Sequence, residues 1–268
     1  MPLFKSDDVE INYIKEGKGK PLVLIPGLGG KLTGWQQFIV PFFKEKMTVI
    51  ALDNRGTGKS SRPNYPYSMD IFVSDIKNLL DYLHINEKIH LVGHSMGGMI
   101  AQHFVLKYPD RVKTLMLLAT AAKYDPTPII ESQKLMEHFS EEQKFETRLV
   151  AEYSREFRKR LKLDKNLLAA LKKNFTENPS RPRDFINQGA AIQNHDTRNL
   201  LKNIKQPTLI IVGNKDHIIP TLKHSELLHE SIPNSTLEVL DAPGHGIIIE
   251  SAEEVSNLMW NFMQRNLD

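Results

Sequence analysis

Residues 89–100 read IHLVGHSMGGMI, with one serine among glycines between two apolar runs. The first run is typical of a buried strand, and the second continues with apolar residues at helical spacing. Gly93 and Gly97 lie two positions away from Ser95 on either side. A strand that turns sharply into a helix needs small residues at these places, because larger side chains would clash. The stretch therefore predicts a strand, a tight turn at Ser95 and a helix.

The same residues form a G-x-S-x-G motif in the strand-turn-helix context of a nucleophile elbow. Such a turn keeps the serine hydroxyl exposed. The N–H groups at the start of the following helix point to the same place, where the positive end of the helix dipole favours an oxyanion. A glycine-rich turn with an ordinary serine is the alternative, and the flanking strand and helix argue against it. We therefore expect Ser95 to be a nucleophile.

A serine nucleophile needs a base to take its proton and a carboxylate to orient that base. In this architecture the chain order is serine, acid, histidine. The run PTLIIVGNKDHIIP places Asp216 after one strand, and STLEVLDAPGHGII places His245 between two glycines after the next. Asp241 is less suitable as the acid, because it lies on the same strand end as His245. We predict a catalytic triad of Ser95, Asp216 and His245.

Short β-rich runs recur along the chain with helical stretches between them. Several are continuously apolar, which indicates strands of a mostly parallel sheet with helices on both faces. The runs end in polar or glycine-rich turns with the sequences PGLGG, DNRGTGKS, GHSMGG, GNKD and APGHG. Open α/β sheets bind ligands at the edge where such turns meet. This pattern predicts a doubly wound α/β fold with its site at that edge.

One segment, residues 124–197, contains no strand-like run and is rich in charged residues at helical spacing. We expect it to form a helical cap over the ligand edge of a core domain that comprises residues 1–123 and 198–268. A solvated helical excursion with no role in binding is the alternative. Long insertions in compact domains are usually functional, which favours the cap.

Composition limits the classes of function. The chain has 268 residues, of which 40% are apolar, and its formal net charge is +3, too small to indicate a nucleic-acid partner. There is no cysteine, so disulfides and thiolate metal sites are excluded. The acidic N-terminal stretch does not resemble a signal peptide, and the apolar runs are too short to span a membrane. We expect a cytoplasmic protein, and the mixed charges of its helices permit a homodimer.

These residues resemble the α/β-hydrolase superfamily over nearly the whole chain outside the cap. The resemblance implies an eight-stranded sheet with the cap inserted after the sixth strand. Ser95, Asp216 and His245 match the nucleophile, acid and base positions. The run PGLGG resembles the family's first oxyanion loop, although Pro26 stands where many relatives have histidine. This match implies that the backbone N–H groups of Leu28 and Met96 form the oxyanion hole.

The turn DNRGTGKS also matches the family, and we interpret Asp53 and Arg55 as residues that brace it. A serine nucleophile argues against haloalkane dehalogenases and epoxide hydrolases, which use aspartate. The motifs are similar to those of small carboxylesterases, monoacylglycerol-lipase-like enzymes and 3-oxoadipate enol-lactonases. Met96 argues against proline iminopeptidases, which usually have tryptophan in the elbow.

We therefore expect a serine hydrolase, a carboxylesterase that acts on small to medium esters, thioesters or lactones without metal or cofactor. Cofactor-free C–C bond hydrolysis, perhydrolysis and a slow ligand-binding receptor are the alternatives. His224 and His229 have a spacing that could suit a metal but more often marks a solvated helix face. The apolar Met96, Leu28 and Ile247 favour an uncharged acyl group, unless Arg55 or a cap arginine supplies charge. Candidates for lining the pocket are Trp35, Met69, Phe185, Ile192 and His195.

Overall fold

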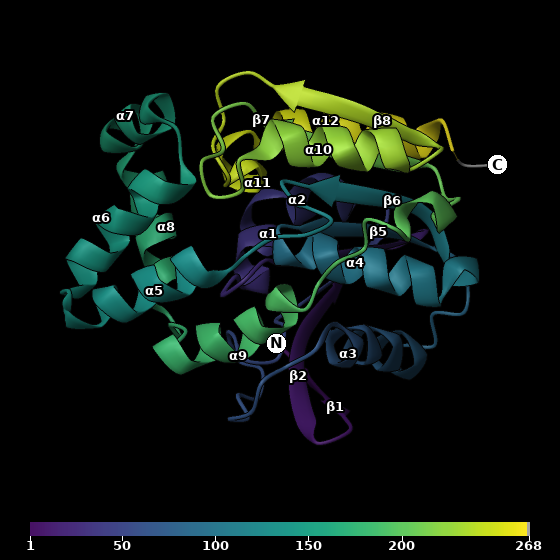
Figure 1. The fold of residues 1–268 in the computed structure, drawn as a ribbon, viewed down its shortest axis with the longest axis horizontal. Helices are drawn as coiled ribbons and strands as arrows, with labels where there is room; N and C mark the ends of the chain where they lie inside the picture. Colours follow the sequence, from purple (N-terminus) through teal and green to yellow (C-terminus); the bar gives the residue numbers. More distant parts are fainter. Residues whose placement is uncertain (267–268) are drawn as a thin grey trace.

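The computed structural model describes residues 1–266 and, for Thr221, the backbone alone. Strands and helices alternate along most of the chain (Figure 1). The strands are β1 Leu3–Ser6, β2 Val9–Glu16, β3 Pro21–Ile25, β4 Thr48–Leu52, β5 Ile89–His94, β6 Val112–Leu118, β7 Thr208–Gly213 and β8 Ser235–Leu240. The helices are α1 Leu32–Phe38, α2 Val40–Phe43, α3 Met69–Tyr82, α4 Met96–Lys107, α5 Thr127–Leu135, α6 Glu141–Glu152, α7 Arg155–Leu163, α8 Lys165–Thr176, α9 Pro182–Gln193, α10 Thr221–Ser231, α11 Ile247–Glu250 and α12 Ala252–Gln264.

The eight strands form one sheet in the order β1-β2-β4-β3-β5-β6-β7-β8. The pairs β1–β2 and β2–β4 are antiparallel, and every later pair is parallel. The strand with the elbow, β5, lies at the centre between β3 and β6. The turns after β3, β5, β7 and β8 therefore meet at one edge of the sheet.

Helices cover both faces of the sheet, and alternate residues of a strand enter different cores. In β3, for example, Val23 and Ile25 pack with α3 and α4, whereas Leu22 and Leu24 pack with α1, α2 and α12. This division follows from the two-residue period of a strand. It explains why the central strands are apolar throughout.

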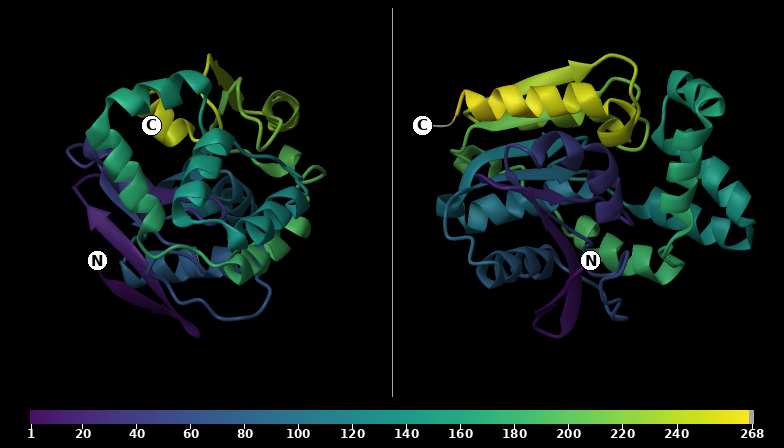
Figure 2. Two further views of the ribbon diagram at one scale, coloured as in Figure 1. Left: turned by 90° about the vertical axis from the view of Figure 1, so that its left-hand side faces the viewer. Right: turned by 180° about the vertical axis from the view of Figure 1, so that it is seen from behind.

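Helices α5–α9, here called the inserted helices, lie between β6 and β7 in the chain. Figure 1 shows them together on one side of the molecule, beyond an edge of the sheet, and the reverse view in Figure 2 shows the same arrangement. Helices α6, α7 and α8 share a small core of their own, which contains Phe145, Phe157 and Leu161. The predicted fold class, a doubly wound and mostly parallel eight-stranded sheet with helices inserted after the sixth strand, is confirmed.

The chain enters and leaves the inserted helices through two adjacent connections. Lys123 and Asp196 form an isolated antiparallel bridge, and the Thr197 N–H donates to the Ala122 carbonyl at 2.9 Å. Within residues 1–266, every helix is too short or too polar to span a lipid bilayer.

Candidate active site

Ser95 occupies the tight turn between β5 and α4 and has a left-handed backbone conformation, with φ 55° and ψ −121°. Its N–H donates to the Leu118 carbonyl at 2.9 Å. Its own carbonyl accepts hydrogen bonds from the Gly98 N–H at 2.9 Å and from the Thr120 hydroxyl at 2.7 Å. These contacts with neighbouring elements hold a conformation that costs on the order of 1–3 kcal/mol for a residue with a side chain.

The two glycines of the motif are needed because backbones approach closely at the elbow. A Cβ atom added at Gly93 would lie 2.2 Å from the Gly97 carbonyl oxygen. A Cβ atom at Gly97 would lie 2.2 Å from the carbonyl oxygen of Ile25, at the end of β3. The elbow thus packs directly against the strand end that leads into the PGLGG loop.

His245 and Asp216 are hydrogen-bonded, with 2.7 Å between His245 Nδ1 and Asp216 Oδ2. The other carboxylate oxygen, Oδ1, accepts from the N–H groups of Ile218 at 2.9 Å and Ile219 at 3.1 Å. Since Nδ1 donates to the carboxylate, Nε2 of the neutral ring carries a free lone pair. Burial disfavours the charged imidazolium, but the Asp216 carboxylate outweighs burial and raises the pKa of His245 above 6.5.

The neighbouring acid, Asp241, is engaged elsewhere. Its Oδ1 accepts from the Asn214 amide at 2.7 Å. The structure therefore pairs His245 with Asp216, which is the pairing expected from the sequence.

The loop that carries His245 is held from three sides. Glu250 accepts from the Gly244 N–H at 3.0 Å, and the Gly246 N–H donates to the Glu152 carbonyl, at the end of α6, at 2.9 Å. His94 Nε2 donates to the His245 carbonyl at 2.9 Å. Burial, together with the nearby His245, lowers the pKa of His94 to about 3, so His94 remains a neutral donor.

The PGLGG loop forms a tight turn closed by a hydrogen bond from the Gly30 N–H to the Gly27 carbonyl at 3.0 Å. Gly27 faces Ser95: a Cβ atom there would lie 3.0 Å from Ser95 Cβ. Neither the Leu28 N–H nor the Met96 N–H has an acceptor among residues 1–266. Both are therefore available to a ligand beside Ser95.

Gln188 of α9 fixes the next residue of this loop. Its side-chain oxygen accepts from the Gly29 N–H at 2.9 Å, and its side-chain NH₂ donates to the Arg55 carbonyl at 2.7 Å. Gln188 is fully buried. This role could not be predicted from the sequence, because a glutamine on a helix is usually exposed.

Two cavities meet at Ser95. One has a volume of about 110 Å³ and lies among the PGLGG loop, Trp35, His94 and helices α6 and α8. The other, about 550 Å³, lies between the strand ends and the inserted helices. The residues shared by both cavities are Leu28, Gly29, Lys31, Ser95, Arg148, Glu152, Phe175 and His245. A ligand at Ser95 would thus have room on two sides.

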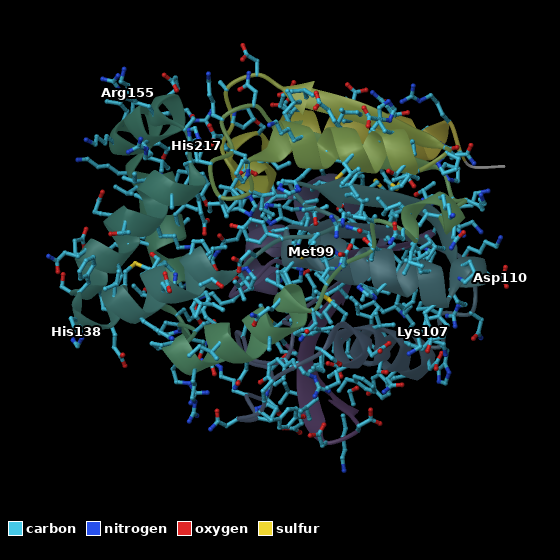
Figure 3. The ribbon with its side chains drawn as sticks, in the orientation of Figure 1. Met99, Lys107, Asp110, His138, Arg155 and His217 are labelled. Atoms are coloured by element: carbon cyan, nitrogen blue, oxygen red, sulfur yellow. The ribbon has the colours of Figure 1, made fainter. Side chains whose placement is uncertain are left out.

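The inserted helices and the Asp216 loop line the larger cavity. His217, next to Asp216, is one of the lining residues, and Figure 3 shows it on the side of the core that faces these helices. Arg155, by contrast, lies on the outer helix α7 in the same view. The cavity is therefore bounded by residues distant in sequence.

The candidates for pocket lining divide into two groups. Trp35 lines the smaller cavity and Phe185 the larger one. Met69, Ile192 and His195 are buried in the core and line neither cavity. This agrees with the expectation that each candidate, taken singly, is more often a core or surface residue than a ligand contact.

Lys31 and Arg148, the two lysine or arginine side chains that line both cavities, could not be singled out from the sequence. Lys31 follows the PGLGG loop, and Arg148 lies on α6 one turn before Glu152, to which its Nε donates at 2.5 Å. The only available signals were the position of Lys31 beside the loop and the general expectation of a cap arginine. Arg55, the other arginine considered, lines neither cavity.

Arg55 and Asp53 have structural contacts. Arg55 forms a buried ion pair with Asp75, with Nε 2.7 Å from Oδ2. Asp53 accepts from the N–H groups of Leu32 at 2.8 Å and Lys59 at 3.0 Å. These bonds agree with the interpretation of both residues as braces of the turn after β4.

The remaining histidines considered from the sequence do not form a metal-type cluster. His229 Nδ1 lies 2.9 Å from the Ser235 hydroxyl. Within the described chain, no three His, Asp or Glu residues are grouped as metal ligands would be.

The chain is similar to known proteins both in sequence and in structure. The model of the family described as alpha/beta hydrolase fold matches residues 20–252. The chain is 29% identical over 271 residues to 2-hydroxymuconate semialdehyde hydrolase of Pseudomonas sp. (strain CF600), a match that covers 95% of the chain and 90% of that protein. It is 29% identical over 274 residues to 3-oxoadipate enol-lactonase 2 of Acinetobacter baylyi, with 99% of each covered. The crystal structure of the enol-lactonase from Burkholderia xenovorans LB400 superposes with a TM-score of 0.87 at 23% identity, over 98% of this chain and 100% of that one, which shows a shared fold.

Proposed function

Because the chain belongs to the alpha/beta hydrolase fold family, we propose that it is a serine hydrolase that cleaves small to medium carboxylic esters, including thioesters or lactones. The observation that carries this proposal is the hydrogen bond of 2.7 Å between His245 and Asp216 beside the strained Ser95 turn. His245 and Ser95 line the same two cavities. A base held by a carboxylate next to a serine that lines a cavity is the arrangement that acyl transfer requires.

In the first half of the proposed reaction, His245 Nε2 takes the proton of the Ser95 hydroxyl as its oxygen attacks the substrate carbonyl carbon. The Leu28 and Met96 N–H groups donate to the oxyanion that forms. The bond to the alcohol then breaks, and the imidazolium returns its proton to the leaving oxygen. Asp216 holds the ring in the required tautomer throughout.

In the second half, water attacks the acyl-enzyme. His245 takes a proton from this water, and the acid product leaves as Ser95 regains its hydrogen. The two free N–H groups at the oxyanion position contribute here as well. Removal of one such donor typically costs roughly 100- to 1,000-fold in rate.

The test is hydrolysis of p-nitrophenyl acetate, butyrate, octanoate and laurate by the wild type and by Ser95→Ala. We expect the variant to lose at least about 10⁴-fold in kcat, because the nucleophile is absent. The chain-length profile of the wild type measures how much acyl chain the cavities accept. A wild type no faster than Ser95→Ala on all four esters would overturn the esterase proposal and favour perhydrolysis or a receptor role.

C–C bond hydrolysis on the same three residues is the second candidate. It is favoured by the similarity to 2-hydroxymuconate semialdehyde hydrolase and by the presence of space on two sides of Ser95. The discriminating measurement is product analysis with a vinylogous diketone. Cleavage of the diketone by a protein that leaves p-nitrophenyl esters intact would select this reaction.

A further inference from the structure

Lys31 and Arg148 come from different parts of the chain and both line the junction of the two cavities. Lys31 belongs to the core, directly after the PGLGG loop, and Arg148 belongs to the inserted helix α6. Both line both cavities, as does Ser95. A substrate at Ser95 would therefore occupy cavities that two cationic side chains line.

The two cations have unused hydrogen-bond donors. Lys31 donates to the carbonyls of Asn174 and Glu177 at the end of α8, which uses two of its three N–H groups. Arg148 donates through Nε to Glu152, and its two terminal nitrogens have no acceptor within residues 1–266. An arginine fork with both terminal nitrogens free matches the geometry of a carboxylate.

The charge balance at the junction is positive. In the smaller cavity the charged lining residues are Lys31, Arg148 and Glu152, and Glu152 already accepts from Arg148. Burial, and then repulsion by Arg148, lowers the pKa of Lys31 to about 8, although Asp53 and Glu177 oppose this shift and Arg62 adds to it. An anion between the two cations would relieve their repulsion.

The larger cavity does not supply that anion. Of its other charged lining residues, Glu141 pairs with Lys144 at 2.8 Å, and Arg181 pairs with Asp184 at 2.9 Å. Glu137 is exposed to solvent. The cations at the junction are thus left without a carboxylate partner, apart from the one bond of Arg148 to Glu152.

We propose that the substrate carries a carboxylate, which Lys31 and Arg148 bind at the junction of the two cavities beside Ser95. This assignment rests on the proposed function and names its substrate class: an ester or lactone with a free carboxylate on its acyl or its alcohol half. It reverses the preference for an uncharged acyl group that Met96, Leu28 and Ile247 suggested. Of those three residues only Leu28 lines the cavities, because Met96 and Ile247 are buried in the core, whereas Lys31 and Arg148 line both cavities.

The kinetic test compares matched pairs of substrates. On the acyl side, the p-nitrophenyl monoester of glutaric acid is compared with p-nitrophenyl pentanoate. On the alcohol side, 4-acetoxybenzoate is compared with phenyl acetate, each rate being corrected for the uncatalysed reaction. We expect the wild type to hydrolyse the anionic member of one pair faster than its neutral partner. The pair that shows this preference identifies whether the acyl half or the alcohol half of the substrate carries the carboxylate.

The variants are Lys31→Met and Arg148→Met, and the readout is the ratio of kcat/KM for the anionic to the neutral member. Each variant should lower this ratio by about tenfold or more, the value of one charge-assisted hydrogen bond. If Lys31→Met only displaced α8, to which Lys31 donates, hydrolysis of both members would slow by the same factor and the ratio would not change. The matched control is Lys172→Met, which removes a cation that pairs with Glu142 and lines neither cavity, and its ratio should equal that of the wild type.

The pH dependence gives a second signature of Lys31. The preference for the anionic substrate should be largest below about pH 8, where the lysine is charged, and should decline above it. In Lys31→Met this decline should disappear. A wild type with no anionic preference, or variants with an unchanged ratio, would overturn the proposal.

A binding measurement separates this proposal from the esterase proposal. Ser95→Ala is titrated with monomethyl glutarate and with the neutral dimethyl glutarate by calorimetry. Tighter binding of the monoanion, lost in the Ser95→Ala/Arg148→Met double variant, supports the carboxylate site even if the wild type hydrolyses no ester. Equal binding of the two compounds contradicts it.

Discussion

At the scale of single residues, the protonation of His245 decides when the proposed base can work. Burial opposes the imidazolium, but Asp216 outweighs burial, so the pKa of His245 lies above 6.5. A general base must be unprotonated. Activity on a neutral ester should therefore be low at acidic pH and should rise as the pH passes the raised pKa of His245.

Asp216→Asn tests this assignment. The substitution removes the carboxylate that raises the pKa and leaves the burial that lowers it, so the midpoint of kcat/KM should move to lower pH. The plateau rate should fall by about 10⁴-fold, because the ring loses its required tautomer. The measurement is kcat/KM for p-nitrophenyl acetate between about pH 5 and pH 9. Asp241→Asn is the control, and its midpoint should equal that of the wild type. If the midpoint moved in Asp241→Asn and not in Asp216→Asn, Asp241 would be the acid and our assignment would be wrong.

The candidate residues differ in how well the sequence predicts them. Ser95, Asp216 and His245 could be proposed because each follows a recognisable strand at a turn. Lys31, Arg148 and Gln188 could not, because their roles depend on where the inserted helices lie over the core. A lysine, arginine or glutamine at helical spacing has the same pattern on a solvated face as in a cavity.

At the scale of elements, the elbow depends on close contact between β5, α4 and the end of β3. Gly97→Ala would place a Cβ atom 2.2 Å from the Ile25 carbonyl oxygen, and backbone on both sides prevents easy relief. We expect the free energy of unfolding to fall by about 3 kcal/mol or more, as in severe overpacking. Urea denaturation measures it.

The control for this substitution is Gly34→Ala in helix α1, where the nearest atom, Asn174 Nδ2, lies 3.9 Å from the added Cβ. Alanine is the better helix former, so this variant should gain roughly 0.5–1 kcal/mol. If Gly97→Ala were as stable as Gly34→Ala, the elbow would be less tightly packed than the structure indicates.

The strands were the part of the fold that the sequence predicted best. The β-rich runs VEINYI, PLVLIPG, MTVIALD, IHLVGHS, VKTLMLLAT, PTLIIVGNKD and STLEVLDAPGH correspond to β2–β8. Apolar runs bounded by turns are a strong local signal. The short strand Leu3–Ser6 had no such signal, since only Phe4 and Ser6 are buried and its other residues are exposed. It is placed by antiparallel pairing with β2.

At the scale of the whole molecule, Gln188 joins the inserted helices to the core. Gln188→Met keeps the size of the side chain but leaves the Gly29 N–H and the Arg55 carbonyl without a partner. The free energy of unfolding should fall by about 2 kcal/mol or more, since buried unpaired groups are costly. Because Gly29 follows Leu28, kcat/KM for p-nitrophenyl acetate should fall as well.

Thermal unfolding and ester hydrolysis are measured on the same samples of this variant. Gln193→Met, on the exposed face of the same helix, is the control and should match the wild type in both. A Gln188→Met variant with normal stability and rate would show that α9 does not position the PGLGG loop.

The paired connections at Lys123 and Asp196 have a consequence for how this chain can change. The inserted helices leave the core and return to it at neighbouring points, so their replacement requires no rearrangement of the sheet. Because the entropy of closing a loop grows slowly with its length, segments of quite different size could be exchanged there at a similar cost in chain entropy. Ser95, Asp216 and His245 all lie outside the exchanged segment, whereas Arg148 and Gln188 lie within it. Evolution and engineering could therefore graft a new substrate preference onto the proposed catalytic residues, left unchanged, by altering one continuous stretch of sequence.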